Sequence, residues 1–319
     1  MTCAQIRGYL FEIFISKMLE ENGFIKCEYN SGNQIHQKPC ELKSQDGEIQ
    51  GRGTKHQIDF IGIYERNIPF IYPLRILVEC KYYKTGVYKN VIREFIGVIK
   101  DIDENYFYNQ REERIRFLNV PIIFSATFFH DDAINLAWAH GINTISYHNI
   151  PILKDFLRRL DICVRKTCKN GNYITKEKAN IVKKQFSNHF EISNLKTFLF
   201  ATTEKGLLIN LISNDKFPHE LFENTDERSC GIYFSENNEN QDENNRVFFV
   251  SLHDDTQNRR FYFQASDTLM RKGFSILPLS ERINQKKKYF KQLTIIKKIS
   301  GIYRMIKLNV EFGDLERIL

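Results

Sequence analysis

Apolar and polar positions divide the chain into a first half in which strands and helices alternate and a second half made mostly of strands. In the first half, apolar residues recur at helical spacing in four segments, and short β-prone runs lie between them. The β-α-β-α order of the later segments implies parallel strands joined by helical crossovers. The expected helices cover residues 4–21, 90–104, 131–140 and 150–160, and the expected strands cover residues 24–29, 58–64, 76–81, 120–127 and 142–148.

The second half has a different pattern. Residues 161–180 are basic and rich in turn-forming residues, so we expect a link between a domain at residues 1–160 and another at residues 181–319. Residues 281–308 mix lysines with apolar positions and are expected to form a helix that grips a nucleic-acid backbone or covers a sheet. The expected fold class is α/β with a C-terminal α+β domain that serves recognition, regulation or oligomerisation. The expected strands of the C-terminal domain are TFLFAT, LLINLIS, CGIYFS, RVFFVSL and RRFYFQA.

Composition narrows the class of protein only slightly. The 319 residues are 42% hydrophobic and 27% charged, which is typical of globular proteins, and no apolar run is long enough to cross a bilayer. We therefore expect a cytoplasmic protein without a membrane partner. The net charge of +7 agrees with a polyanionic partner but does not establish one. Seven cysteines with no C-x-x-C pair predict reduced thiols and no zinc site.

Three charged residues lie on the two strands around residues 58–64 and 76–81. Side chains alternate between the faces of a strand, so Glu79 and Lys81 point to one face and Cys80 to the other. Asp59 on the neighbouring strand can point to the same place as Glu79 and Lys81. The spacing therefore allows two carboxylates and one ammonium group to converge, although an ordinary ion pair on an exposed strand face would give the same pattern.

This combination suits hydrolysis of a phosphodiester. Oxygen ligands favour Mg²⁺, which polarises the phosphate and helps to generate hydroxide. A lysine whose pKa is lowered by neighbouring charge and partial burial can orient or deprotonate the attacking water.

An aspartate about twenty residues before E-x-K resembles the PD-(D/E)xK nuclease pattern, with Ile58-Asp59 in the place of "PD" and Glu79-Cys80-Lys81 in the place of "(D/E)xK". Three further segments, GYLFEIFISKMLEENGF, VIREFIGVI and IIFSATFFHDDAINLAWAHGI, are similar to units of the Mrr-like restriction endonucleases. The resemblance covers residues 5–153. Two departures are Glu79, where many Mrr-like enzymes carry glutamine, and a glycine-rich lead-in reduced to Gly51 and Gly53.

The resemblance implies a restriction-endonuclease-like mixed sheet flanked by helices, and it assigns roles to individual residues. Asp59 and Glu79 would bind Mg²⁺ or Mn²⁺, with the backbone carbonyl of Cys80 as a further ligand, and Lys81 would orient the water. Glu12 in the first helix would be a supporting acid, unless it is a solvated helix residue.

Several polar residues around these positions are candidates for nucleic-acid binding. Those before Asp59 are Lys55, His56 and Gln57, whose alternative is solvation at the start of a strand. A tyrosine- and lysine-rich loop with Tyr82 and Lys84 follows Lys81 and fits contacts with sugar-phosphate and bases, or is simply a polar loop. Arg93 would bind phosphate or pair with a neighbouring acid in its helix.

The leading hypothesis is a metal-dependent endonuclease that cuts double-stranded DNA, acts in restriction or defence and forms a homo-oligomer. The alternatives are a nucleic-acid-binding or sensing module that keeps the nuclease fold, and a nuclease for RNA or single strands. The His253-Asp254-Asp255 sequence resembles a metal-binding trio, but it lies between two expected strands, and we interpret it as a turn.

Overall fold

The computed structural model divides into two compact units, which are described separately. The first unit contains residues 1–145 and 164–187, and the second contains residues 146–163 and 188–319. Within the part of the chain that is described, no helix is long and apolar enough to span a membrane. The description covers residues 1–319 except 28–47, 67–70, 108–115, 149, 169–172, 189–194, 207, 236–246, 266–280, 282–283, 285–286 and 312–319.

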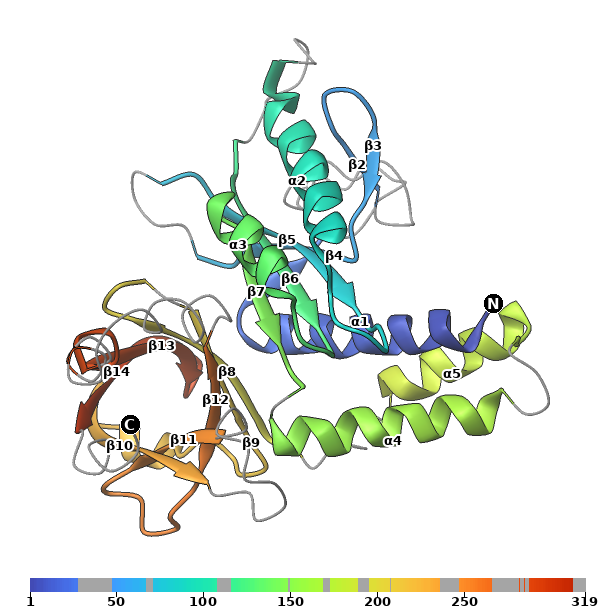
Figure 1. Cartoon of the computed structure of the whole chain (residues 1–319). Helices are drawn as coiled ribbons and strands as arrows, with labels where there is room; N and C mark the ends of the chain where they lie inside the picture. The colour runs from blue at the N-terminus through green and yellow to red at the C-terminus, as the bar shows by residue number, and fades with distance from the viewer. Residues whose placement is uncertain are drawn as a thin grey trace. The chain divides into compact units, whose positions relative to one another are not determined.

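The first unit is built on a mixed sheet with the strand order β1-β4-β5-β6-β7 (Figure 1). β4 pairs antiparallel with both β1 and β5, whereas β5 and β6 are parallel. The expected strand pair and the parallel neighbour that follows it are thus confirmed, and the unit is mixed α/β. The strands are β1 (Phe24–Lys26), β4 (Phe60–Tyr64), β5 (Leu74–Lys81), β6 (Leu118–Ser125) and β7 (Asn143–Ser146).

The helices of this unit follow the predicted apolar spacing. α1 (Cys3–Glu21) begins with a reciprocal capping box between Thr2 and Gln5, and Gly23, with φ +86°, follows its end as expected. α2 (Lys89–Asp103) and α3 (Asp131–Ala139) cover the sheet. The side chains that join these two helices to the sheet in one apolar cluster include Ile61, Leu77, Ile123, Ile92, Phe95, Ile99, Ala133, Ile134 and Ala137.

The boundary between the two halves is helical. α4 (Pro151–Thr167) runs into the segment at residues 161–180 that was expected to be a turn-rich link, and α5 (Lys176–Asn188) begins within it. The connection between these helices is attached to the start of the chain. Ile174 N donates to Met1 O at 2.9 Å, Met1 N donates to Ile174 O at 3.1 Å, and Thr2 and Tyr173 form an isolated bridge. α5 therefore belongs to the first unit.

The prediction of reduced cysteines was wrong for this region. Cys3 and Cys168 form a disulfide, and Cys27 is also disulfide-bonded. Because Cys3 is the first residue of α1, this bond adds a covalent link to the pairing of Met1 and Thr2 with residues 173–174.

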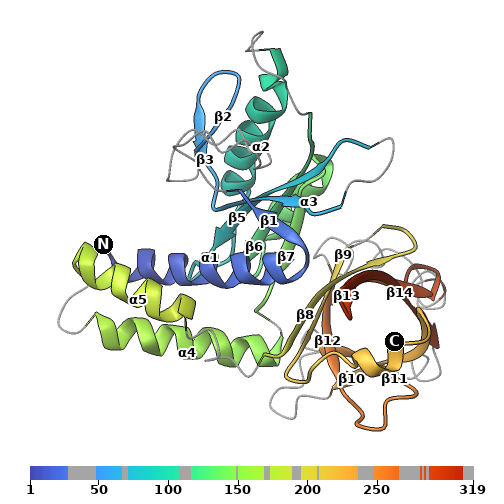
Figure 2. The same cartoon turned by 180° about the vertical axis from the view of Figure 1, so that it is seen from behind.

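The second unit contains a closed barrel with the strand order β10-β11-β12-β9-β8-β13-β14 (Figure 2). Pairing is antiparallel except where β10 meets β14, which are parallel. The five strand-like runs expected beyond residue 180 all form strands. The barrel strands are β8 (Thr197–Thr203), β9 (Leu208–Ser213), β10 (Glu227–Ser235), β11 (Val247–Leu252), β12 (Phe261–Ala265), β13 (Gln292–Ile299) and β14 (Ile302–Glu311).

The helix expected over residues 281–308 was wrong from residue 292 onwards, because residues 292–311 form the β13–β14 hairpin. Ser300 and Gly301 both have positive φ and form the two-residue turn. Leu293 and Ile295 are buried and separated by one less buried residue, a period of two that belongs to a strand. A lysine-rich helix that grips nucleic acid is therefore absent from these residues.

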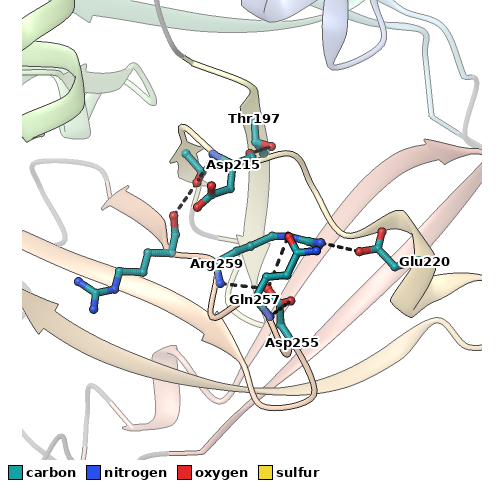
Figure 3. A network of polar contacts seen from close by, with 8 residues as sticks. Thr197, Asp215, Glu220, Asp255, Gln257 and Arg259 are labelled. Atoms are coloured by element: carbon teal, nitrogen blue, oxygen red, sulfur yellow. Dashed lines mark hydrogen bonds and ion pairs between the residues drawn. The ribbon is translucent and has the colours of Figure 1, made fainter.

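A buried network fixes the turn between β11 and β12 (Figure 3). Asp255 accepts hydrogen bonds from the backbone of Gln257 and Arg259, at 3.1 Å each. The guanidinium of Arg259 donates to Gln257 Oε1 at 3.0 Å and to Glu220 Oε1 at 2.7 Å. These contacts confirm the interpretation of residues 253–255 as a turn.

Candidate active site

The site is built where the β4–β5 ladder ends. The last pair at this end of the ladder is Phe60 with Val78, so the backbone N–H of Cys80 has no strand partner on that side. Asp59, one residue before β4, fills this gap, because its Oδ2 accepts a 2.7 Å hydrogen bond from Cys80 N. In a strand the N–H and C=O of one residue point to the same side. The carbonyl of Cys80 therefore faces the side on which Asp59 lies.

Glu79 and Lys81 form the ion pair that their spacing predicts, with Lys81 Nζ donating to Glu79 Oε1. Burial alone would lower the pKa of Lys81, but the charge of Glu79 and the hydrogen bond to it raise that pKa above its usual value. This upward shift of the pKa of Lys81 is opposite to the lowered pKa that the sequence predicted. Lys81 is therefore a cation at neutral pH that can orient water or stabilise negative charge, and it is not set up to take a proton.

Three acids share this region, and their charges act on one another. Burial, followed by the charges of Glu79 and Glu12, raises the pKa of Asp59 to about 8. Burial, followed by the charge of Glu79, raises the pKa of Glu12 in α1 to about 7. Glu12 is thus close enough to Asp59 and Glu79 to belong to the site. Glu12 is partly buried, and this burial is the largest cause of its raised pKa.

Lys183 in α5 was not predicted. Its positive charge lowers the pKa of Glu12 and opposes the effect of burial. Lys183 Nζ lies 3.4 Å from the ring centroid of Tyr9, a cation–π contact on α1, three residues before Glu12. Burial lowers the pKa of Lys183 itself, while Glu12 acts in the opposite direction. No sequence signal links a lysine at position 183 to a glutamate at position 12, because the proximity depends on how α5 packs.

The residues expected to bind nucleic acid before Asp59 lie on β3 (Lys55–Gln57), which pairs with β2 (Glu48–Gln50). His56 Nε2 is 2.7 Å from Asp101 Oδ2 in α2, and this hydrogen bond lowers the pKa of Asp101. Lys55 faces Glu48 at 4.0 Å, and Gln57 is exposed. The contact with Asp101 holds the β2–β3 hairpin on α2. The Nε2 atom of His56 is therefore engaged in a structural contact within the protein.

The other three candidates differ in their surroundings. Tyr82 packs edge-on against Phe11 at 5.7 Å and lies under the guanidinium of Arg7 at 4.6 Å, which joins the end of β5 to α1. Lys84 and Arg93 are exposed. The structure therefore gives Tyr82 a packing role and leaves Lys84 and Arg93 accessible.

The oxygen atoms of the candidate site suit the coordination of Mg²⁺. Among the described residues, no three His, Cys, Asp or Glu side chains are arranged to hold a metal ion. Mg²⁺, however, needs only one or two carboxylates, and takes its other oxygens from water, carbonyls and substrate phosphate. Asp59, Glu79 and the Cys80 carbonyl supply such a set, and the mutual repulsion of the acids would be relieved by a cation. The residues fit the metal that the resemblance implies.

Comparisons with known proteins give little further guidance. No family model matches the chain, and no curated protein matches it. Among solved structures, a crystal structure titled as a protein of unknown function, AF1548, aligns with 56% of this chain and 98% of its own length. The two are 18% identical, with a TM-score of 0.31.

Proposed function

We propose that this chain is a Mg²⁺- or Mn²⁺-dependent endonuclease whose first unit has a restriction-endonuclease-like fold of the Mrr type. The observation that carries the proposal is the hydrogen bond from Cys80 N to Asp59, which brings the carboxyl group of the residue before β4 next to the Glu79–Lys81 pair of β5. Two strands thereby present two carboxylates, one carbonyl and one ammonium group together, the arrangement that phosphodiester hydrolysis needs.

Each residue has a distinct task in this proposal. Asp59, Glu79 and the Cys80 carbonyl hold the metal ion, which when bound polarises the scissile phosphate and lowers the pKa of water. Lys81, charged at neutral pH, orients the attacking water and stabilises charge that develops on the phosphate. Glu12 is a third acid near the metal ligands. The positive charge of Lys183 partly offsets the negative charge of Glu12.

A second candidate is a nucleic-acid-binding or sensing module without turnover. The ion pair between Lys81 and Glu79 supports it, because this pair engages an oxygen that metal binding would need. Two converging carboxyl groups argue against it, because a binding module has no need of them and, once ionised, they repel phosphate unless a cation lies between them.

The experiment that separates these candidates is a panel of nucleic acids incubated with the full chain in Mg²⁺, in Mn²⁺ and in EDTA. The panel contains double-stranded DNA, single-stranded DNA and RNA. We expect cleavage of DNA that requires a divalent metal and is lost in Lys81→Met, a variant of similar length without the charge. The exposed Lys100→Met, in the last turn of α2, is the matched control. Binding without cleavage in every metal would favour the sensing module.

A further inference from the structure

Two aromatic N-cap residues meet where β5 and β6 end. Tyr88 precedes α2 and His130 precedes α3, and their rings stack with centroids 3.9 Å apart and planes inclined by 17°. Phe128 packs edge-on against His130 at 5.0 Å. Tyr88 is 50% exposed and Phe128 37% exposed. Tyr88, Phe128 and His130 therefore form an aromatic shelf that solvent reaches.

The shelf is held firmly by its backbone. Val87 N donates to Phe128 O at 2.9 Å, and His130 N donates to Val87 O at 3.0 Å. A Cβ atom on Gly86 would lie 2.5 Å from the Phe128 ring and 2.9 Å from His130 Nε2, so a glycine is needed beneath the rings. The rings are thus positioned before any ligand arrives, which lowers the entropic cost of stacking on them.

The shelf is also close to the candidate active site. Lys81 and Ser125 are register partners, and Ala126 N donates to Lys81 O at 3.0 Å. Phe128 follows Ser125 by three residues, and adjacent strands are about 5 Å apart, so the backbone of Phe128 in the shelf lies within roughly 15 Å of that of Lys81. A few nucleotides cover that span, so one strand can reach both places.

The exposed aromatic surface of the shelf favours unpaired bases over bases that are stacked inside a duplex. A planar aromatic surface binds a base by stacking on its face, whatever the base. Bases inside a duplex have both faces covered by their neighbours, so only an unpaired, terminal or extruded base can stack on a protein ring. The exposed Lys84 lies in the loop between Lys81 and the shelf and offers a charge to the connecting backbone.

We propose that Tyr88, Phe128 and His130 form a stacking site for an unpaired nucleobase of the strand that is cut. This rests on the proposed nuclease function and narrows its substrate to DNA with a single-stranded or unpaired stretch beside the scissile bond.

The test is binding of the full chain, in EDTA, to a single-stranded oligodeoxynucleotide carrying the fluorescent base 2-aminopurine and to a relaxed, covalently closed circular duplex that contains the same sequence and has no terminal base. Stacking quenches the fluorescence of 2-aminopurine. We expect Tyr88→Ala to weaken single-strand binding about tenfold, within the range for loss of one stacked base, and to remove the quenching. Tyr88→Phe should keep both, and neither variant should alter duplex binding. Gly86→Ala, which displaces the neighbouring rings, should weaken single-strand binding in the same direction.

Tyr72→Ala is the matched control, because Tyr72 is 54% exposed and lies before the opposite end of β5. Unchanged quenching and affinity in Tyr88→Ala, or an equal loss in Tyr72→Ala, overturns the stacking site. Cleavage assays on the same variants separate the two proposals. If Tyr88 is needed for single-strand binding but no metal supports cleavage, the nuclease function fails and the stacking site stands. If cleavage needs Asp59 while Tyr88→Ala cuts every substrate at the wild-type rate, the stacking site fails alone.

Discussion

The side chain of Asp59 accepts a hydrogen bond from the backbone of Cys80 at 2.7 Å, across a point where the two strands no longer pair. This contact substitutes for a missing ladder bond and at the same time fixes the position of a carboxylate. The carboxylate is nevertheless in a poor environment for its charge, because it is buried beside Glu79 and Glu12. The relationship predicts how stability and metal binding depend on pH.

Asp59 should destabilise the metal-free protein as pH rises. Its pKa is raised from 3.8 to about 8 in the folded state, so between these values the folded protein binds a proton that the unfolded chain has released. Stability from this group is present below about pH 4 and is lost as pH rises towards 8, at no more than about 1.4 kcal/mol per pH unit. Asp59→Asn should remove that loss. Chemical denaturation in EDTA at pH 5 and pH 8 measures it, and an Asn variant no more stable than wild type at pH 8 would contradict the account.

Metal binding should release protons near neutral pH. Asp59, with a pKa of about 8, and Glu12, with a pKa of about 7, are largely or partly protonated before a cation arrives. A bound metal requires the ionised carboxylate, so affinity should increase from pH 6 to pH 8. Calorimetric titration with Mg²⁺ or Mn²⁺ in buffers of different ionisation enthalpy counts the released protons. Binding with no proton release at pH 7 would show that Asp59 does not hold the metal.

Lys183 should set the acidic limit of activity through Glu12. Removing its charge in Lys183→Gln should raise the pKa of Glu12 above about 7, because that charge lowers it. If the ionised form of Glu12 is the active one, the acidic limb of the rate profile moves to higher pH, and Lys183→Arg restores it. Lys184→Gln, at the exposed neighbouring position, is the control. Identical pH profiles for the Lys183 and Lys184 variants would leave Lys183 with a packing role only.

The disulfide between Cys3 and Cys168 should stabilise the first unit. It closes a loop of 165 residues between the start of α1 and the end of α4. A bond of this kind typically contributes about 2–4 kcal/mol. Cys3→Ser should therefore lower Tm, whereas Cys163→Ser, at an exposed cysteine that forms no disulfide, should not. Peptide mapping without reductant checks the pairing directly, and reduced thiols at both positions would show that the bond is not formed in solution.

Sequence reasoning succeeded where one local rule decided the outcome. The period of two along β5 predicted the Glu79–Lys81 pair, and helical spacing predicted the buried faces of α1 and α2. It failed where local patterns compete, as in the Ser300–Gly301 hairpin, whose apolar and lysine residues also fit a helical stripe. Sequence reasoning also failed where distant segments meet. The disulfide between Cys3 and Cys168 was missed, because the spacing of cysteines along the chain does not show which of them pair.

The central claim is that Asp59 and Glu79 serve metal-dependent hydrolysis of a phosphodiester. The most direct measurement is the rate of DNA cleavage in Mg²⁺ by wild type, Asp59→Ala and Glu79→Ala, with circular dichroism to show that each variant is folded. The account predicts that either substitution lowers the rate by about a hundredfold or more, as expected for loss of a group that acts in the transition state. A folded Asp59→Ala protein that cleaves DNA at the wild-type rate would contradict it.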